Sequence, residues 1–265
     1  MSELGSWRVT EDDRRAGRPV VLAVDFTATG RPEAAFAALA RGLGTGHAVW
    51  ESLAPPPGEE SGMSAEDYLL RWTGELRAQD VSVSHVFGYC ASSVFALALA
   101  ERVGGWQRTP SVVLFDPTAI NGETVLRYGF RPVIDALSGV LGADGVADAY
   151  REGEQAVAAE SELAALTEEF IRIYRRFGAA AFERLGLKAD RVEELVGWFR
   201  SYLHYVVAAG RMPVTTGLPD VSVVRSCDLP GNLDVRPDRE LRFEVDHAEL
   251  LGHPDVAKAV ADLLR

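Results

Sequence analysis

The chain has 265 residues, of which 47% are apolar and 25% are charged. That length can bury the core of one domain with an insertion, or of two small domains. The net charge of −12 disfavours nucleic acids and anionic membranes as main partners, because both attract basic surfaces. No stretch approaches the roughly 20 apolar residues of a membrane helix, and the first residues lack the apolar run of a secretory signal. We therefore expect a globular, cytoplasmic protein.

Apolar runs and helical segments alternate along the first 120 residues. A valine-rich run after Pro19 is typical of a strand buried on both faces of a parallel sheet. Ser64 lies three residues before Asp67, near a capping-box pattern that predicts the start of a helix. Strands are expected at residues 48–52, 83–89, 111–115, 221–225 and 241–245, and helices at residues 32–41, 64–77 and 92–103. This alternation predicts an α/β fold with a mostly parallel, doubly wound sheet.

The alternation stops after Ile120. Between Gly122 and about Arg211 the sequence contains only helical patterns. We therefore predict a core formed by residues 1–120 and 213–265, with an all-helical insertion at residues 121–212. An insertion at the carboxyl end of a strand lies where open α/β sheets bind ligands, so we expect it to act as a lid.

The strand at residues 83–89 runs into Gly88-Tyr89-Cys90-Ala91-Ser92 and then directly into a helix. This is the context of a nucleophile elbow, which holds the nucleophile in a sharp turn and needs small residues two positions away. Gly88 and Ser92 meet that need, and a helix N-terminus favours a thiolate at Cys90. A buried structural cysteine is the alternative for Cys90. Cys227, the second cysteine, is interpreted as structural.

A cysteine nucleophile needs a base, and His247 starts a loop after the last predicted strand. The other four histidines lie within strands or helices or directly before one, where packing or capping is the default role: His47, His85, His204 and His253. The acid that orients the imidazole is expected to be Asp116, which ends the strand at residues 111–115. Asp228, after the strand at residues 221–225, is the alternative acid.

These residues resemble the catalytic residues of the α/β-hydrolase-fold thioesterases, type I or type II, of polyketide and nonribosomal peptide assembly lines. The chain order Cys90, Asp116, His247 agrees with the nucleophile, acid, base order of that fold. His247 also begins a His-x-x-x-Leu pattern before the final helix, as in the family. The resemblance implies that the backbone amides of Thr27 and Ala91 form the oxyanion hole. Most relatives use serine, whereas some assembly-line thioesterases and a group of carrier-protein acyltransferases resemble this chain in using cysteine.

The resemblance implies acyl transfer from a thioester on the phosphopantetheine arm of an acyl or peptidyl carrier protein, or from a CoA thioester, through acyl-Cys90. A thioester on cysteine stays reactive toward amines and thiols, which favours transfer or cyclisation. A hydrolytic editing thioesterase or esterase is the alternative. A catalytically degenerate scaffold that binds assembly-line proteins is an alternative of another class. We expect no cofactor and no metal, since the sequence lacks a P-loop, a dinucleotide fingerprint and zinc-ligand spacing.

A carrier-protein partner raises an electrostatic question, because such carriers are generally acidic and this chain is acidic too. Docking would then need a local basic patch. Arg172, Arg175 and Arg176 in the insertion are the candidates, together with Arg127 and Arg131 at its start. A solvated helix face is the alternative interpretation of these arginines.

Overall fold

The computed structural model describes residues 5–9, 19–26, 35–44, 46–56, 58–60, 62–229 and 231–265. These residues form two compact units, each considered by itself. The sheet unit comprises the described residues up to Ala54, Ser64–Ala119 and Met212–Arg265, and the helical unit comprises those of Pro55–Met63 and Ile120–Arg211. The helical unit thus includes the segment at residues 55–63, which the sequence analysis did not assign to the insertion.

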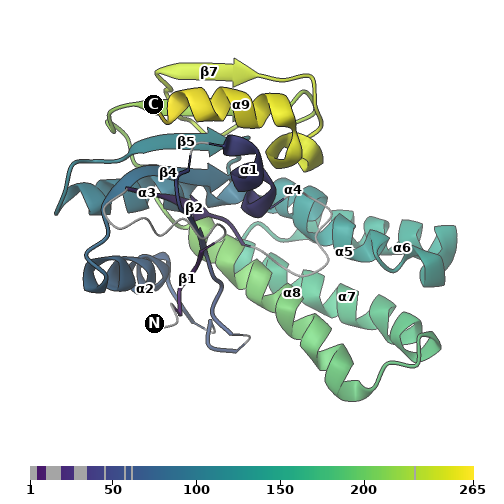
Figure 1. Ribbon diagram of the computed structural model, residues 1–265. Helices are drawn as coiled ribbons and strands as arrows, with labels where there is room; N and C mark the ends of the chain where they lie inside the picture. Colours follow the sequence, from purple (N-terminus) through teal and green to yellow (C-terminus); the bar gives the residue numbers. More distant parts are fainter. Residues whose placement is uncertain are drawn as a thin grey trace. The chain divides into compact units, whose positions relative to one another are not determined.

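The sheet unit contains a seven-stranded sheet in the order β1-β3-β2-β4-β5-β6-β7 (Figure 1). Among these strands β1 alone runs antiparallel to its neighbour, and β2 to β7 are parallel. This confirms the predicted mostly parallel sheet. The strands are β1 (Trp7–Val9), β2 (Val20–Val24), β3 (Val49–Ser52), β4 (Val83–Tyr89), β5 (Ser111–Phe115), β6 (Val221–Arg225) and β7 (Arg239–Arg242).

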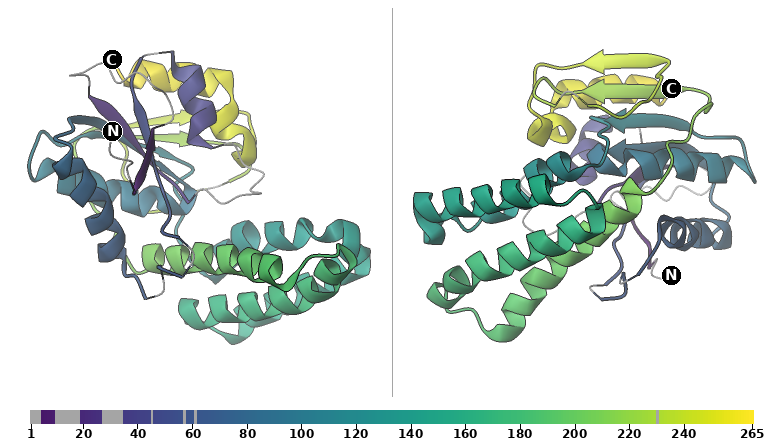
Figure 2. Two further views of the ribbon diagram at one scale, coloured as in Figure 1. Left: turned by 60° about the horizontal axis from the view of Figure 1, so that its bottom comes forward. Right: turned by 180° about the vertical axis from the view of Figure 1, so that it is seen from behind.

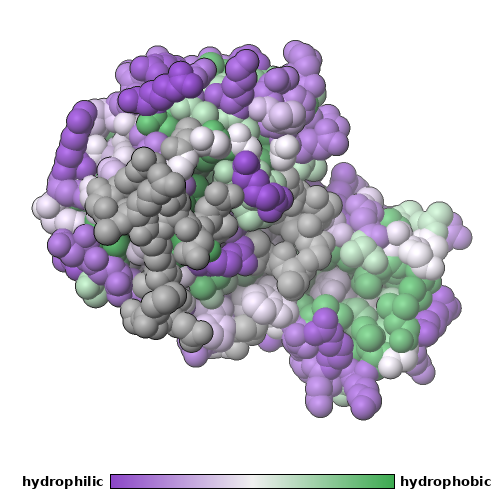
Figure 3. Space-filling view, in the orientation of Figure 1, coloured by the Kyte–Doolittle hydropathy of each residue, from purple (hydrophilic) through white to green (hydrophobic). Residues whose placement is uncertain are grey.

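Two strands differ from the prediction. β1 was not predicted, since three residues give too short a pattern. β7 begins two residues before the predicted strand at residues 241–245, because the polar residues Arg239 and Glu240 pair with β6 at an exposed edge of the sheet. That edge is hydrophilic in the space-filling view (Figure 3). Charged residues at an edge discourage pairing with further strands.

Helices cover both faces of the sheet (Figures 1 and 2). Helices α1 (Phe36–Leu43) and α9 (Pro254–Leu263) pack on one face, while α2 (Ala65–Ala78) and α3 (Ser93–Gly104) cover the other. The two short 3-10 helices η1 (Cys90–Ser92) and η3 (His247–Gly252) complete this unit.

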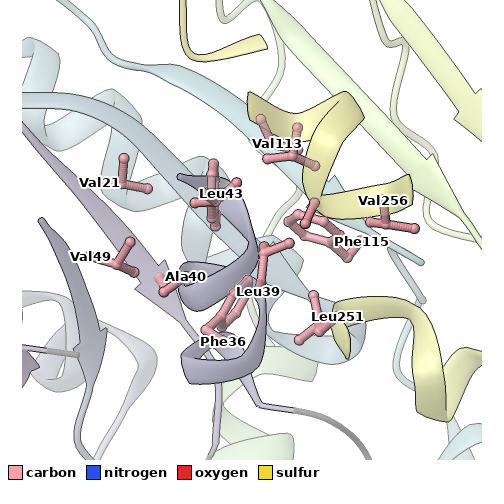
Figure 4. Close-up of a cluster of buried hydrophobic side chains, with 14 of the residues drawn as sticks. Val21, Phe36, Leu39, Ala40, Leu43, Val49, Val113, Phe115, Leu251 and Val256 are labelled. Atoms are coloured by element: carbon pink, nitrogen blue, oxygen red, sulfur yellow. The ribbon is translucent and has the colours of Figure 1, made fainter. Parts of the chain in front are cut away.

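The core between α1, α9 and the sheet is built from apolar side chains of all three (Figure 4). The ring centroid of Phe36 lies 6.0 Å from that of Phe87 and 5.7 Å from that of Phe115. On the opposite face, Trp72 of α2 meets Phe95 of α3 edge-on at 5.3 Å. Burial of these large rings on both faces fixes the strands on which the site residues lie.

Helix α2 begins as its sequence predicts. The Ser64 hydroxyl accepts a hydrogen bond from the Asp67 amide at 3.3 Å, and the Ser64 amide donates to Asp67 Oδ2 at 2.7 Å. This is the reciprocal capping box that the spacing of the two residues indicates.

The described residues of the helical unit form helices and no strand. They are α4 (Gly122–Val125), the π-helical turn η2 (Leu126–Phe130), α5 (Arg131–Asp135), α6 (Ser138–Ala159), α7 (Leu163–Arg184) and α8 (Ala189–Gly210). Gly142, with φ 71°, interrupts α6. Helix α7 packs against both α6 and α8, and Tyr174 meets Phe199 at 5.0 Å between ring centroids. No helix in the described part of the chain is both long and apolar enough to cross a membrane.

Candidate active site

Cys90 lies at a sharp turn between β4 and the helical stretch η1–α3. Its backbone is left-handed, with φ 50°, which is rare outside glycine. A Cβ atom at Gly88 would lie 2.6 Å from Ala96 Cβ and 3.0 Å from Ser93 Cα. Only glycine therefore lets β4 and α3 approach this closely, and Ser92 on the other side of the turn is small and buried. The turn has the geometry of a nucleophile elbow.

Asp116 follows β5 and is fully buried. It too has a left-handed backbone, with φ 44°. Its Oδ1 accepts a hydrogen bond from the Ser226 amide at 2.8 Å, and its own amide donates to the Val224 carbonyl at 2.9 Å. The Thr118 hydroxyl donates to the Asp116 carbonyl at 2.8 Å. These contacts hold the carboxylate in one orientation at the carboxyl edge of the sheet.

His247 is the first residue of η3 and is buried. Its Nδ1 lies 2.8 Å from Asp116 Oδ2. An ionised carboxylate can only accept hydrogen bonds, so Nδ1 carries the proton of this bond. The other ring nitrogen, Nε2, is left for the hydrogen bond that links the imidazole to Cys90. The structure therefore brings Cys90, His247 and Asp116 together in a chain of hydrogen bonds.

The environment of His247 shifts its protonation. Burial alone lowers the pKa of the imidazole, but the hydrogen bonds with Asp116 and Cys90 outweigh burial and raise the pKa to about 9. His247 is therefore protonated at neutral pH. A protonated imidazole beside Cys90 can donate its proton during a reaction at the sulfur.

Two further side chains contact the backbone of His247. The Tyr89 ring stacks on the imidazole, with 4.6 Å between centroids and 7° between planes, and its hydroxyl donates to the His247 carbonyl at 2.9 Å. Asp228 Oδ1 accepts a hydrogen bond from the His247 amide at 2.7 Å. Asp228, the alternative acid of the sequence analysis, thus contacts the backbone while Asp116 contacts the ring. The sequence analysis gave Tyr89 no role, although its position beside Cys90 at a strand end was a signal.

Of the two residues predicted to form the oxyanion hole, the structure describes only Ala91. Thr27 lies outside the described residues. Ala91 is the second residue of η1, directly after Cys90. Backbone amides in the first turn of a helix have no acceptor within that helix, so this amide is suited to bind an oxyanion.

Cys227, for which the sequence analysis predicts a structural role, is exposed. Its thiol donates to Asp246 Oδ1 at 3.8 Å, and slight desolvation with the nearby charges of Asp246 and Asp228 raises its pKa. Cys227, Asp228 and Asp246 are the one group of described residues whose potential metal-ligating atoms lie within 4.8 Å of one another. All three are exposed to solvent, and we assign no metal to them.

Four of the five arginines predicted to dock a carrier protein are paired with a glutamate, while Arg127 Cζ lies 5.2 Å from the centroid of the Tyr128 ring. Arg172 binds Glu169 one turn earlier in α7, and Arg176 pairs with Glu152 of α6. Arg175 Nη2 lies 2.8 Å from Glu193 Oε2 of α8. The same holds for Arg131, which lies 2.7 Å from Glu154. The positive charge of this surface is therefore smaller than the arginines alone suggest.

A scan against protein-family models found no match, and a search of curated proteins found none either. Solved structures match over nearly the whole chain. The Vlm2 thioesterase domain with genetically encoded 2,3-diaminopropionic acid, bound with a dodecadepsipeptide, matches with a TM-score of 0.56 and 14% identity over 99% of this chain and 97% of that chain. The enol-lactonase from Burkholderia xenovorans LB400 matches with a TM-score of 0.56 and 14% identity over 97% and 95% of the two chains.

The four-domain nonribosomal peptide synthetase AB3403, bound to AMP and glycine, also matches, with a TM-score of 0.58 and 13% identity over 95% of this chain and 19% of that chain. At these identities the similarity concerns the fold. The match extends over both the sheet unit and the helical unit, since at least 95% of this chain is covered in all three comparisons. The chain therefore has the α/β-hydrolase fold that its sequence predicts.

Proposed function

We propose that this protein is a thioesterase-like enzyme that takes an acyl group from a phosphopantetheinyl carrier protein, or from a CoA thioester, onto Cys90. The observation that carries this proposal is the hydrogen-bonded series of Cys90, His247 and Asp116 at the elbow. The similar solved structures support it, since one is a thioesterase domain bound with a dodecadepsipeptide and another is a nonribosomal peptide synthetase.

In the first step, the Cys90 thiolate attacks the carbonyl carbon of the incoming thioester. A carbon–sulfur bond forms to Cys90, and the bond to the phosphopantetheine sulfur breaks. Protonated His247 gives its Nε2 proton to the departing thiolate, which leaves as a thiol, while Asp116 holds the imidazole in place. The Ala91 amide, with that of Thr27, stabilises the negative charge that develops on the carbonyl oxygen.

In the second step, neutral His247 removes a proton from the acceptor, which attacks the acyl-Cys90 carbonyl. The Cys90 thiolate leaves, and His247 is again protonated. Exchange of one thioester for another keeps the acyl group activated toward amines and thiols. We therefore propose transfer or cyclisation, with hydrolysis as the outcome when water is the acceptor.

The first experiment tests for the covalent intermediate. A carrier protein loaded with an acyl-phosphopantetheine thioester is incubated with the enzyme, and the intact mass is measured. The wild type should gain the mass of the acyl group, and Cys90→Ala should gain none. Cys227→Ala is the matched control and should be acylated like the wild type. An adduct on Cys90→Ala would contradict the proposal.

The second experiment identifies the acceptor. Products are compared with and without added amines or thiols. An acyl amide or a new thioester supports transfer, and the free acid alone shows a hydrolytic thioesterase. If a thiol-reactive acyl probe fails to label Cys90, the chain is a scaffold instead of an enzyme.

A further inference from the structure

His247 is held at more points than its bond to Asp116 requires. Its carbonyl accepts from the Tyr89 hydroxyl at 2.9 Å, and its amide donates to Asp228 at 2.7 Å. Its ring stacks face to face on the Tyr89 ring. Both polar backbone groups and one face of the imidazole are therefore bound by side chains.

The two partners come from different strand ends. Tyr89 is the last residue of β4 and the neighbour of Cys90, and it is buried. Asp228 follows β6, and the adjacent Cys227 amide donates to the Val245 carbonyl at 2.9 Å, which ties this loop to the segment before His247. Through Tyr89, the backbone of His247 is thus hydrogen-bonded directly to β4, the strand that Cys90 follows.

We propose that Tyr89 and Asp228 form a base clamp, two positioning residues that fix His247 relative to Cys90, and that Asp228 acts through its hydrogen bond and not through its charge. The inference rests on the proposed function of Cys90 and His247. Fixing the backbone of His247 and the plane of its ring sets the distance from Nε2 to the Cys90 sulfur. A displacement of about 1 Å at such a site can reduce the rate about 100-fold.

The claim about charge follows from the partner of Asp228. The group it binds is a neutral backbone amide, whereas Nδ1 of the imidazole is already bound by Asp116. The side-chain oxygen of asparagine accepts the same bond from the amide. Asp228→Asn should therefore keep the clamp and Asp228→Ala should lose it. If Asp228 were the acid of the site, both substitutions would be harmful.

The test measures alkylation of Cys90 by iodoacetamide between pH 5 and 10, in a Cys227→Ser background so that one thiol remains. The profile of wild-type Cys90 is the reference. In Asp228→Ala and in Tyr89→Phe, we expect the midpoint of the pH profile to move upward and acylation by the carrier to slow about 10-fold at unchanged KM. Asp228→Asn should match the wild type.

Asp234→Ala is the matched control, since Asp234 is an exposed aspartate of the same loop. Tyr89→Phe keeps the ring stack and loses only the hydroxyl, so it tests the clamp even if Asp228→Ala folds poorly. The base clamp is wrong if Asp228→Ala and Tyr89→Phe both keep the wild-type pH profile. The claim that Asp228 acts through its hydrogen bond and not its charge is wrong if Asp228→Asn behaves like Asp228→Ala. Alkylation needs no thioester, so a shifted profile without acylation would overturn the proposed function and leave the clamp standing.

Discussion

At the residue scale, the charge of His247 couples the site to the stability of the fold. Its pKa is raised to about 9 in the folded protein, against 6.5 for an ordinary histidine. A group whose pKa is raised by folding stabilises the folded state fully below its unfolded pKa and loses that contribution as the pH rises through the folded pKa. The contribution of His247 is therefore complete below about pH 6.5 and is lost between pH 6.5 and 9.

The raised pKa of His247 predicts that the wild type and His247→Gln differ in how their stability changes with pH. Over the range from pH 6.5 to 9, the free energy of unfolding of the wild type should fall by about 1–3 kcal/mol more than that of His247→Gln. Urea denaturation at a series of pH values measures it. Gly74→Ala is the control, because Gly74 lies within α2 and carries no titratable group, and it should keep the wild-type slope. Parallel curves for wild type and His247→Gln would contradict the raised pKa.

Asp116→Asn offers a second prediction at this scale. The Ser226 amide needs an acceptor at Oδ1, so the amide nitrogen of an asparagine would face His247 Nδ1. The asparagine amide can only donate, so His247 Nδ1 would have to accept, which moves the ring proton to Nε2 and leaves the base in the wrong tautomer. Acylation of Cys90 should slow about 100-fold to 10,000-fold. Acylation reactions quenched at a series of times measure the rate. A loss of rate smaller than that caused by Asp228→Ala would contradict the role of Asp116 as the residue that orients the imidazole.

The chemistry of single residues was easier to predict than their contacts. Cys90, Asp116 and His247 follow strands that the sequence predicts, and parallel strands end at one edge of a sheet, so their proximity could be expected. Tyr89 and Asp228 depend on the path of the loop before His247. Whether Asp116 or Asp228 meets the ring is a matter of a few ångströms, which no spacing in the sequence encodes.

At the element scale, the elbow depends on the close approach of β4 and α3 at Gly88. A methyl group there would overlap Ala96 Cβ at 2.6 Å and crowd the Ser93 backbone. Gly88→Ala should destabilise the fold by about 1–3 kcal/mol, as overpacking of a core does. It should also slow the alkylation of Cys90, because the turn that presents the thiol must shift.

Gly74→Ala is the matched control for this prediction. Gly74 lies within α2, and a Cβ there would have no neighbour within 4 Å. Replacing a helical glycine by alanine should stabilise the fold by about 0.5–1 kcal/mol. Thermal and urea unfolding measure both variants, and a neutral Gly88→Ala would show that the two elements can separate.

Elements with a buried apolar run were predicted most closely. The residues of β4, β5 and β6 agree with the predicted ranges, because continuous valine-rich runs are typical of central parallel strands. Strand β7 was displaced, since its exposed charged residues carry no apolar pattern and their pairing depends on β6. The turn at Gly142 within α6 was missed, as one glycine does not show whether a helix is interrupted.

At the scale of the whole molecule, the net charge of −12 bears on the proposed carrier partner. An acidic enzyme and an acidic carrier repel each other over distances up to the Debye length, about 8–10 Å in physiological salt. Docking then depends on local charge. In α7 that charge is balanced, because Arg172, Arg175 and Arg176 each pair with a glutamate.

Because Arg172, Arg175 and Arg176 are each paired with a glutamate, their proposed docking role can be tested by changing either the arginines or the glutamates. Reversing the charge of all three arginines to glutamate should lower kcat/KM for a carrier-bound acyl group about 10-fold at low salt, with little change for a small soluble thioester. Neutralising their partners, by Glu152→Gln, Glu169→Gln and Glu193→Gln, should raise kcat/KM for the carrier-bound substrate. Exposed ion pairs contribute about 0–1 kcal/mol each, so the fold should tolerate both sets.

Arg242→Glu is the control for these variants, because Arg242 is an exposed, glutamate-paired arginine of the sheet unit. It changes the net charge without changing α7. Arg242→Glu could lower kcat/KM for the carrier-bound substrate as much, per unit of charge changed, as the α7 variants do. In that case the net charge of the protein governs association with the carrier, and α7 is not a docking site. If the arginine variants instead lose both substrates equally, the arginines support the helices that hold them. A selective loss that disappears in high salt is the result that a docking surface requires.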